Sequence, residues 1–299
     1  MSVVIPTKDR IDAICKAVAS ILEQTVLPEE IIVVDSSKNF DSCSFLKDRF
    51  TNSVPRVKCI RSDVVLTTAR NIGIEHSSGD LIFFFDDDVV LDEDYIKEVV
   101  NVFMNDQEGK IGGVMGNIRN LQIDTSSLTA IVKCLSFLDH FGDGKFLPSG
   151  LPTYVHGQKG AMQTEFLSGC MSAYRRKVLN EFAFDEKLGK LSGYCYLEDV
   201  DMSYRVSRKY VLWYTPLAKL EHHPSMNQKS FYQIAKQHVV NHSYLFKKNM
   251  PKTLSTMFAF FMSLLGILLI NGFFRRSGKA IIGWFEGTLY VIRTCRHSL

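Results

Sequence analysis

The feature that most constrains the fold is an alternation of short β-branched runs with helical patterns over the first 120 residues. The runs that predict strands are 3–5, 31–34, 81–85 and 111–115, and the helical spacings fall in 11–22, 67–74 and 95–103. Such β-α-β alternation indicates an α/β protein with a mostly parallel sheet and helices on both faces. In these sheets ligands bind beyond the carboxyl ends of the strands.

Polar residues stand where that rule places a ligand. They are Pro6, Thr7, Asp9 and Arg10 after the first strand, Asp35 after the second, and Asp86, Asp87 and Asp88 after Phe83-Phe84-Phe85. No GxGxxG or GKS/T loop accompanies them, so backbone amides alone are not expected to hold a phosphate. Adjacent carboxylates repel one another unless a cation compensates them. We therefore expect a hard divalent cation that could bridge to a diphosphate, with a solvated turn of capping acids as the alternative.

The second half of this region is expected to complete the site. Residues 120–165 are rich in Gly and Pro and predict a long irregular loop region over it. Glu198 and Asp199 open a predicted helix, where a carboxylate beside an acceptor could serve as general base or merely stabilise the helix end. A strand at 211–214 precedes His222 and His223, either of which could supply an imidazole to a Mn²⁺ or similar ion.

The charge of the chain is uneven, although the net charge is only +3. Residues 226–299 contain ten Lys or Arg and one acid, Glu286, which gives +9 there and −6 before it. These cations flank apolar runs, a pattern that favours anionic lipid over nucleic acid. The uncharged run 254–274 is long enough to span a bilayer, and 280–292 suits an interfacial helix or the return arm of a re-entrant hairpin. A buried helix of a dimer interface is the alternative.

The cysteines and the amino terminus bear on the compartment. Seven Cys, an odd number without a CxxC pair, suggest neither a zinc site nor a disulfide framework. The apolar run at 2–5 is too short for a signal peptide. We therefore expect a reducing, cytosolic environment.

A set of short motifs carries a resemblance to a known family. The segments are Ser2 to Arg10, Val33 to Ser36, Ala69 to Gly73, Phe84 to Asp88, Ser168 to Ser172, Phe184 to Glu186 and Glu198 to Asp201. In this order they resemble family 2 glycosyltransferases of the GT-A fold, an inverting family with a Rossmann-like, mostly parallel central sheet. The resemblance covers residues 2 to about 225. It implies a GT-A domain at 1–225, with a nucleotide-sugar half (about 1–118) and an acceptor half (about 119–225), followed by a helical, membrane-associating tail at 226–299.

The resemblance also implies a role for each candidate residue. Those expected to contact the nucleotide-sugar are Pro6, Thr7, Asp9, Asp35, Arg70, Asp86 and Asp87. Asp86 and Asp88 would form a DxD-type motif, with Asp88 and His222 holding Mn²⁺ or Mg²⁺; His223 is the fallback ligand, since only His222 keeps a His-x-x-Ser spacing. Asp199 would be the catalytic base, with Gly169 and Glu198 supporting the acceptor side.

The implied reaction is transfer of one sugar from a nucleotide-diphospho-sugar to an acceptor hydroxyl, with inversion. The chain lacks a Gln-x-x-Arg-Trp motif, which favours a single addition over polymer synthesis. We expect the acceptor to be a glycan or lipid-linked glycan at the cytoplasmic face of the membrane, in polysaccharide biosynthesis of the cell envelope. We expect no nucleic-acid partner, and we leave open whether the protein forms a homo-oligomer. The rivals are a noncatalytic, membrane-tethered scaffold and a sugar-phosphate nucleotidyltransferase, whose Gly-rich N-terminal signature is missing.

Overall fold

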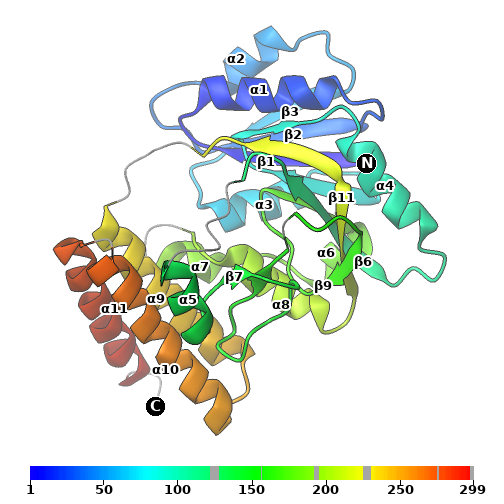
Figure 1. The fold of residues 1–299 in the computed structure, drawn as a ribbon. Helices are drawn as coiled ribbons and strands as arrows, with labels where there is room; N and C mark the ends of the chain where they lie inside the picture. The colour runs from blue at the N-terminus through cyan, green and yellow to red at the C-terminus, as the bar shows by residue number, and fades with distance from the viewer. Residues whose placement is uncertain (122–127, 156, 192–194, 225–229, 275, 297–299) are drawn as a thin grey trace.

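The computed structural model describes residues 1–121, 128–155, 157–191, 195–224, 230–274 and 276–296. The amino-terminal half of the chain forms most of a central sheet, and the carboxyl-terminal part forms a group of helices beside it (Figure 1). The strands of the main sheet are β1 (Ser2–Thr7), β2 (Glu30–Asp35), β3 (Arg56–Arg61), β4 (Leu81–Phe85), β5 (Val89–Leu91), β6 (Ile111–Ile118), β9 (Met162–Thr164), β10 (Met171–Arg175) and β11 (Val211–His222). The short strands β7 (His140–Phe141) and β8 (Thr153–Tyr154) pair separately.

The main sheet is parallel from β3 to β4 and mixed beyond β4. Its order is β3-β2-β1-β4-β10-β6-β11-β5, with β9 added beside β11. The pairs from β3 to β4 and the pair β6–β11 are parallel, whereas β10 runs antiparallel to β4 and β6. The register aligns Thr7 with Asp35 and Val4 with Phe84, so the carboxyl ends of β1, β2 and β4 meet at one edge.

The helices are placed between and around these strands. They are α1 (Ile11–Leu22), α2 (Ser42–Arg49), α3 (Leu66–Glu75), α4 (Tyr95–Asn105), α5 (Leu128–Leu135), α6 (Arg176–Glu181), α7 (Glu186–Leu191), α8 (Glu198–Ser207), α9 (Phe231–Asn249), α10 (Leu254–Leu268) with its π-helical continuation η1 (Leu269–Phe274), and α11 (Gly278–Arg296). α3 packs against β1 and β2, and α4 against β6 and β11. Coverage from both faces leaves β1, β2 and β4 almost entirely buried, which explains their continuous apolar runs.

The strands and helices expected in the first 120 residues are confirmed, with small changes at their ends. The expectation that 120–165 is irregular is wrong at α5, whose Leu128, Ile131 and Leu135 recur at helical spacing. These side chains are all exposed, so α5 presents an apolar face that the sheet does not cover. Residues 122–127 and 156 of that predicted loop lie outside the described chain.

The expectation that the chain forms no disulfide is also wrong. Cys43 of α2 and Cys59 of β3 are joined, with their Cα atoms 5.2 Å apart. The pairing follows from the packing of α2 on β3, which cysteine spacing along the chain does not reveal. Both sulfurs lie within 4.8 Å of a carboxylate oxygen of Asp35.

The carboxyl-terminal helices share a hydrophobic core with the preceding residues. Leu197 and Val200, beside the predicted base, pack in one cluster with Val239 of α9, Ile267 of α10 and Ile270 of η1. Packing therefore crosses the boundary expected at residue 225. Within the described residues, one helical stretch, Leu254–Phe274, is long and apolar enough to cross a membrane, and 39% of its most apolar window is buried inside the protein.

Candidate active site

Asp35 forms the end of the site nearest β2 and β3. Its side chain is fully buried, and its Oδ1 accepts a hydrogen bond from the Ser37 N–H at 2.9 Å. In the described chain Oδ2 has no hydrogen-bond partner, and Arg61 Nη1 lies 3.6 Å from it. A buried carboxylate oxygen of this kind can accept the imide N–H of a nucleobase.

Asp9 shapes the loop beside Asp35. Its backbone is left-handed, with φ of 55°, and its own N–H donates to Ser37 Oγ at 2.6 Å. Asp9 Oδ1 accepts the N–H groups of Lys38 and Asn39 at 3.0 and 3.1 Å. Asp9, which was predicted to contact the nucleotide, thus lies at the same edge of the sheet as Asp35. There it holds the loop that follows β2.

Asp87 is held by residues of the β1 end. Thr7, which follows the buried Pro6 in β1, donates its hydroxyl to Asp87 Oδ2 at 2.7 Å. Arg10 Nη1 donates to Asp87 Oδ1 and to Asp88 Oδ2, both at 2.8 Å. Burial raises the pKa of Asp87 to about 6, although Thr7 and Arg10 oppose the shift. Arg10 was expected at this edge of the sheet but was given no role, and here it is the cation that balances these acids.

Asp86, Asp88 and His222 form a candidate metal centre. One ligand atom from each lies within 4.8 Å of the others, and His222 Nε2 is 3.1 Å from Asp88 Oδ1. β11 carries His222 here because it pairs with β5, which follows the acidic triplet. The pKa of Asp88 lies below its ordinary value. Burial would raise this pKa, but the hydrogen bond with His222 and the charge of Arg10 lower it more. Two carboxylates and an imidazole suit Mn²⁺ and also accept Mg²⁺.

The geometry distinguishes the two histidines. His223 is exposed, and its ring lies 3.0 Å from Glu221 Oε2. Only its backbone touches the cluster, where the His223 N–H donates to the Asp88 carbonyl at 2.8 Å. The side chain that faces the two aspartates is therefore that of His222.

Arg70 connects the metal-binding acids to the α8 end of the site. Its guanidinium is 1% exposed and donates to Glu198 Oε1 at 2.8 Å, to Asp86 Oδ1 at 3.1 Å and to the Gly169 carbonyl at 3.2 Å. It also lies over the Phe184 ring, 5.3 Å from its centroid. Arg70 thus holds acids from both ends of the site in place, and its expected contact with the nucleotide stays a prediction.

Asp199 lies in the first turn of α8, after Leu197, whose φ of 66° is left-handed. Its Oδ2 accepts the Gly169 N–H at 3.1 Å, and its Oδ1 accepts the Val200 N–H at 2.8 Å. Burial and the neighbouring Glu198 raise the pKa of Asp199 to about 7, against the lowering effects of the Gly169 N–H and Arg70. A carboxylate with such a pKa is suited to general base catalysis near neutral pH.

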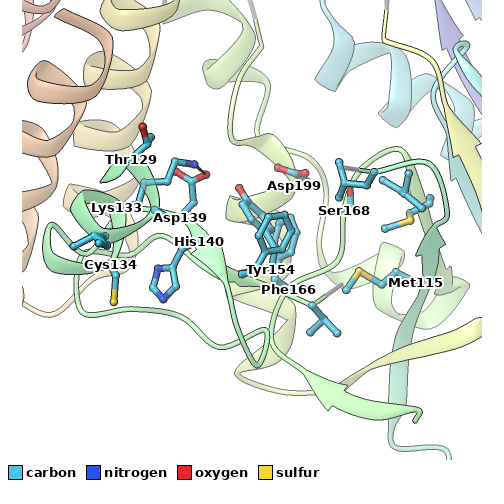
Figure 2. Close-up of a pocket in the computed structure, with 17 residues that line it drawn as sticks. Met115, Thr129, Lys133, Cys134, Asp139, His140, Tyr154, Phe166, Ser168 and Asp199 are labelled. Atoms are coloured by element: carbon cyan, nitrogen blue, oxygen red, sulfur yellow. Dashed lines mark hydrogen bonds and ion pairs between the residues drawn. The ribbon is translucent and has the colours of Figure 1, made fainter. Parts of the chain in front are cut away.

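Asp199 also lines a cavity of about 770 Å³. Figure 2 shows Asp199 between Tyr154 and Ser168. The Lys133–Asp139 ion pair, with Lys133 on α5, lies beyond Tyr154. The lining is mainly apolar and includes Met115, Ile118, Ile131, Phe141, Phe166 and Met171. Of these residues only Met171 lies in one of the motifs, because the others come from separate segments and share no chemical signature.

Comparisons with known proteins agree with this arrangement. The model of the family described as "Glycosyl transferase family 2" matches residues 2–182. An uncharacterized glycosyltransferase, YwdF from Bacillus subtilis, is 35% identical over 88 residues. That match covers 29% of this chain and 32% of the relative, so it spans about a third of the relative's length.

Two solved structures are similar in fold. The mannosyltransferase PcManGT from Pyrobaculum calidifontis, in complex with GDP-Man and Mn²⁺, superposes with a TM-score of 0.59 at 15% identity, over 96% of this chain and 73% of that one. Residues 1–349 of TarS from S. aureus, in complex with UDP-GlcNAc, superpose with a TM-score of 0.57 at 14% identity. The superposition covers 96% of this chain and 78% of that one. These likenesses confirm the GT-A fold. Because the family match extends over more than half of its length, the chain belongs to glycosyl transferase family 2.

Proposed function

We propose that this protein is an inverting, divalent-metal-dependent glycosyltransferase that moves one sugar from a nucleotide-diphospho-sugar to an acceptor hydroxyl. The observation that carries the proposal is the position of Arg70, which touches both Asp86 of the candidate metal centre and Glu198 beside Asp199. A metal-binding cluster and a carboxylate of raised pKa thus stand on either side of one buried guanidinium. The family match and the nucleotide-sugars bound by two proteins of the same fold support it.

The donor would lie along the carboxyl ends of β1, β2 and β4. Asp35 Oδ2 accepts the N–H of the base, and the loop held by Asp9 closes beside it. Asp86, Asp88 and His222 would hold the metal ion, which when bound supplies positive charge to stabilise the leaving diphosphate. Thr7 and Arg10 keep Asp87 and Asp88 in place.

Asp199 would act on the acceptor. Its partly buried carboxylate removes the proton of the acceptor hydroxyl as that oxygen attacks the anomeric carbon from the face opposite the diphosphate. The Gly169 and Val200 N–H groups fix the orientation of the base, and Arg70 balances the charge of Glu198 next to it. Holding both substrates in line supplies much of the remaining acceleration.

The acceptor is proposed to be a lipid-linked glycan at the cytoplasmic face of the membrane, in polysaccharide biosynthesis of the cell envelope. The apolar cavity beside Asp199 supports this proposal, because α5 forms one of its walls and exposes further apolar side chains outside it. The basic tail supports it too, since cations attract anionic lipid.

The substitution Asp199→Asn tests the role of the base. We expect transfer, or hydrolysis of the donor when no acceptor is present, to fall by about 10³-fold, with nucleoside diphosphate affinity unchanged. Asp139→Asn is the matched control, since Asp139 lines the same cavity but pairs with Lys133. Loss of diphosphate affinity with turnover retained would contradict the assignment, and a folded wild type that binds donor without turnover would favour the noncatalytic scaffold.

A further inference from the structure

The carboxyl-terminal helices pack on the protein with one face and expose apolar side chains on the other, which limits how they can bind a membrane. We propose that α10, η1 and α11 lie flat in one leaflet of an anionic membrane, as a monotopic docking surface that does not cross the bilayer. The proposal is independent of the transfer chemistry and depends on two faces of α10. One face is locked into the protein core, and the other is exposed and apolar.

The inner face of α10 and η1 cannot leave the protein without opening its core. Ile267 and Ile270 are 1% and 5% exposed and pack in the cluster that contains Leu197 and Val200. Ser263 on the same side is fully buried. A helix that crossed the bilayer would have to withdraw these side chains from the residues that support Asp199.

The neighbours of α10 also oppose a crossing. Trp284 of α11 donates its indole N–H to the Leu264 carbonyl at 2.8 Å. α11 in turn packs closely on α9, where a Cβ on Gly283 would come within 2.2 Å of the Tyr232 carbonyl. Glu286 of α11 pairs with Lys236 of α9 at 3.0 Å. Crossing would take this ion pair toward the hydrocarbon, which is costly for charged groups.

The outer faces of α10 and α11 each carry a row of exposed apolar side chains. On α10 the exposed side chains are Leu254, Phe258, Phe261 and Leu265, and on α11 they are Ile282, Phe285, Leu289 and Ile292. Their spacings place each row on one side of its helix, opposite the residues that pack on α9. The α10 row is highly exposed, from 89% at Leu254 to 44% at Leu265. Rows of this kind on helices that lie side by side suit insertion to the level of the acyl chains.

The positive charges next to these apolar rows favour anionic lipid as the binding partner. Lys252 before α10, Arg276 before α11, Lys279 in the first turn of α11 and Arg293 near its end are all exposed. Anionic headgroups would attract each of them, whereas a second copy of the same face would bring like charges together. The surface therefore fits an anionic leaflet better than a dimer interface.

The docking surface extends toward the acceptor cavity. Phe137, which follows α5, contacts Phe258 with ring centroids 6.4 Å apart, and Gly266 of α10 lies against Ser136. Ile131 of α5 is exposed and also lines the cavity. If the proposed function holds, a lipid-linked acceptor could pass from the leaflet along α5 to Asp199 without leaving the membrane surface.

The test is flotation of the full chain with vesicles of phosphatidylcholine, alone or mixed with phosphatidylglycerol. We expect binding to the anionic vesicles, cleavage at Arg276 or Lys279 by trypsin added outside them, and a loss of binding of at least about tenfold for the double variant Phe258→Ser, Phe261→Ser, because two aromatic rings no longer enter the acyl chains. The control is Met104→Ser with Leu217→Ser, which removes two equally exposed side chains elsewhere. Melting temperatures establish that both variants are folded.

Three results would overturn the proposal. Full protection of Arg276 and Lys279 from trypsin added outside the vesicles would show a span, and equal binding by the two double variants would show that this face does not dock. A dimer in gel filtration that only the Phe variant dissociates, without a change in flotation, would assign the face to self-association. Binding of a nucleoside diphosphate with Mn²⁺, measured on the same samples, reports the donor site separately, so failure of the proposed transfer function would be recognised independently.

Discussion

At the scale of single residues, Arg70 has the most consequential surroundings. It is buried against two carboxylates and one carbonyl, and together they neutralise and orient it. Removing one partner of a buried pair leaves the others as uncompensated buried charges, which is more costly than losing an exposed ion pair.

The substitution Arg70→Met should therefore lower the free energy of unfolding by about 3–5 kcal/mol. Arg119→Met is the matched control, since Arg119 is half exposed and pairs with Asp92 and Glu221, and it should cost no more than about 1 kcal/mol. Urea unfolding of both variants checks the difference, and equal costs would argue against the central position of Arg70.

Asp199 links activity to pH. With its pKa raised to about 7, the base is protonated below neutral pH, so the transfer rate should fall by about tenfold for each pH unit below 7. A rate–pH profile of the wild type measures this. A profile that is flat from pH 5 to about 8 would exclude Asp199 as the base that limits the rate.

The same pKa predicts a stability effect of Asp199→Asn. A carboxyl whose folded pKa is above its ordinary value destabilises the fold when ionised, fully above about pH 7 and not at all below the ordinary pKa. The variant should melt a few degrees higher than the wild type at pH 8, and this gain should shrink as the pH falls toward 4. A variant that melts lower at pH 8 would contradict the burial of the charge.

At this scale the sequence predicted the acids better than the groups around them. Asp35 ends the buried strand β2, and Asp86 and Asp88 lie just beyond the buried strand β4, where a parallel sheet must place them at one edge. The hydrogen bonds of Arg70 to Glu198 and Asp86 could not be predicted, because its partners lie 128 and 16 residues away. The cavity lining was missed for the same reason.

At the scale of elements, predictability followed the pattern of burial. β1, β2 and β4 are buried on both faces and read as apolar runs, and α1 and α4 bury one regular stripe. α9 lies in the tail that was expected to be helical, but its bounds were not predicted because its buried face carries Gln237, His238, Asn241 and His242, which hide the helical period. α2 was missed because it buries only Ser42 and Leu46.

The contact of α9 with α11 can be tested at Gly283. An alanine there would gain up to about 1 kcal/mol of helix propensity, but its Cβ would meet a backbone carbonyl that cannot move cheaply. Gly283→Ala should therefore destabilise the protein by about 1–3 kcal/mol. Gly278→Ala, with open space around it, should be neutral or slightly stabilising. Thermal unfolding compares the two, and similar melting temperatures would show that the helices are not closely packed.

At the scale of the whole molecule, the carboxyl-terminal helices are part of the support for the acceptor half. The expected division at residue 225 follows the change in charge along the chain, but the core that contains Val200 also contains Ile267. The sequence pattern could not show this, because an apolar run packed on a core and one that spans a membrane have the same composition.

A chain that ends at Met250 should therefore lose stability as well as membrane binding. Its melting temperature should fall by roughly 10 °C, since it exposes the side chains that Ile267 and Ile270 cover. The Phe258→Ser, Phe261→Ser variant should lose much less stability, because both side chains are more than half exposed, although the contact of Phe258 with Phe137, just after α5, is lost. A truncated chain as stable as the full one would make the tail a separate unit.

The most direct test of the central claim is the melting temperature with UDP, dTDP, GDP or CMP, with and without Mn²⁺, for the wild type, Asp88→Ala and the exposed control Glu108→Ala. A ligand that binds only the folded state raises the melting temperature, by about 5–10 °C at a hundredfold excess over Kd for a protein of this size. We expect a metal-dependent rise with one nucleoside diphosphate that persists in Glu108→Ala and disappears in Asp88→Ala. A folded wild type that no nucleotide stabilises, or an equal rise in Asp88→Ala, would contradict the assignment of a metal-dependent donor site.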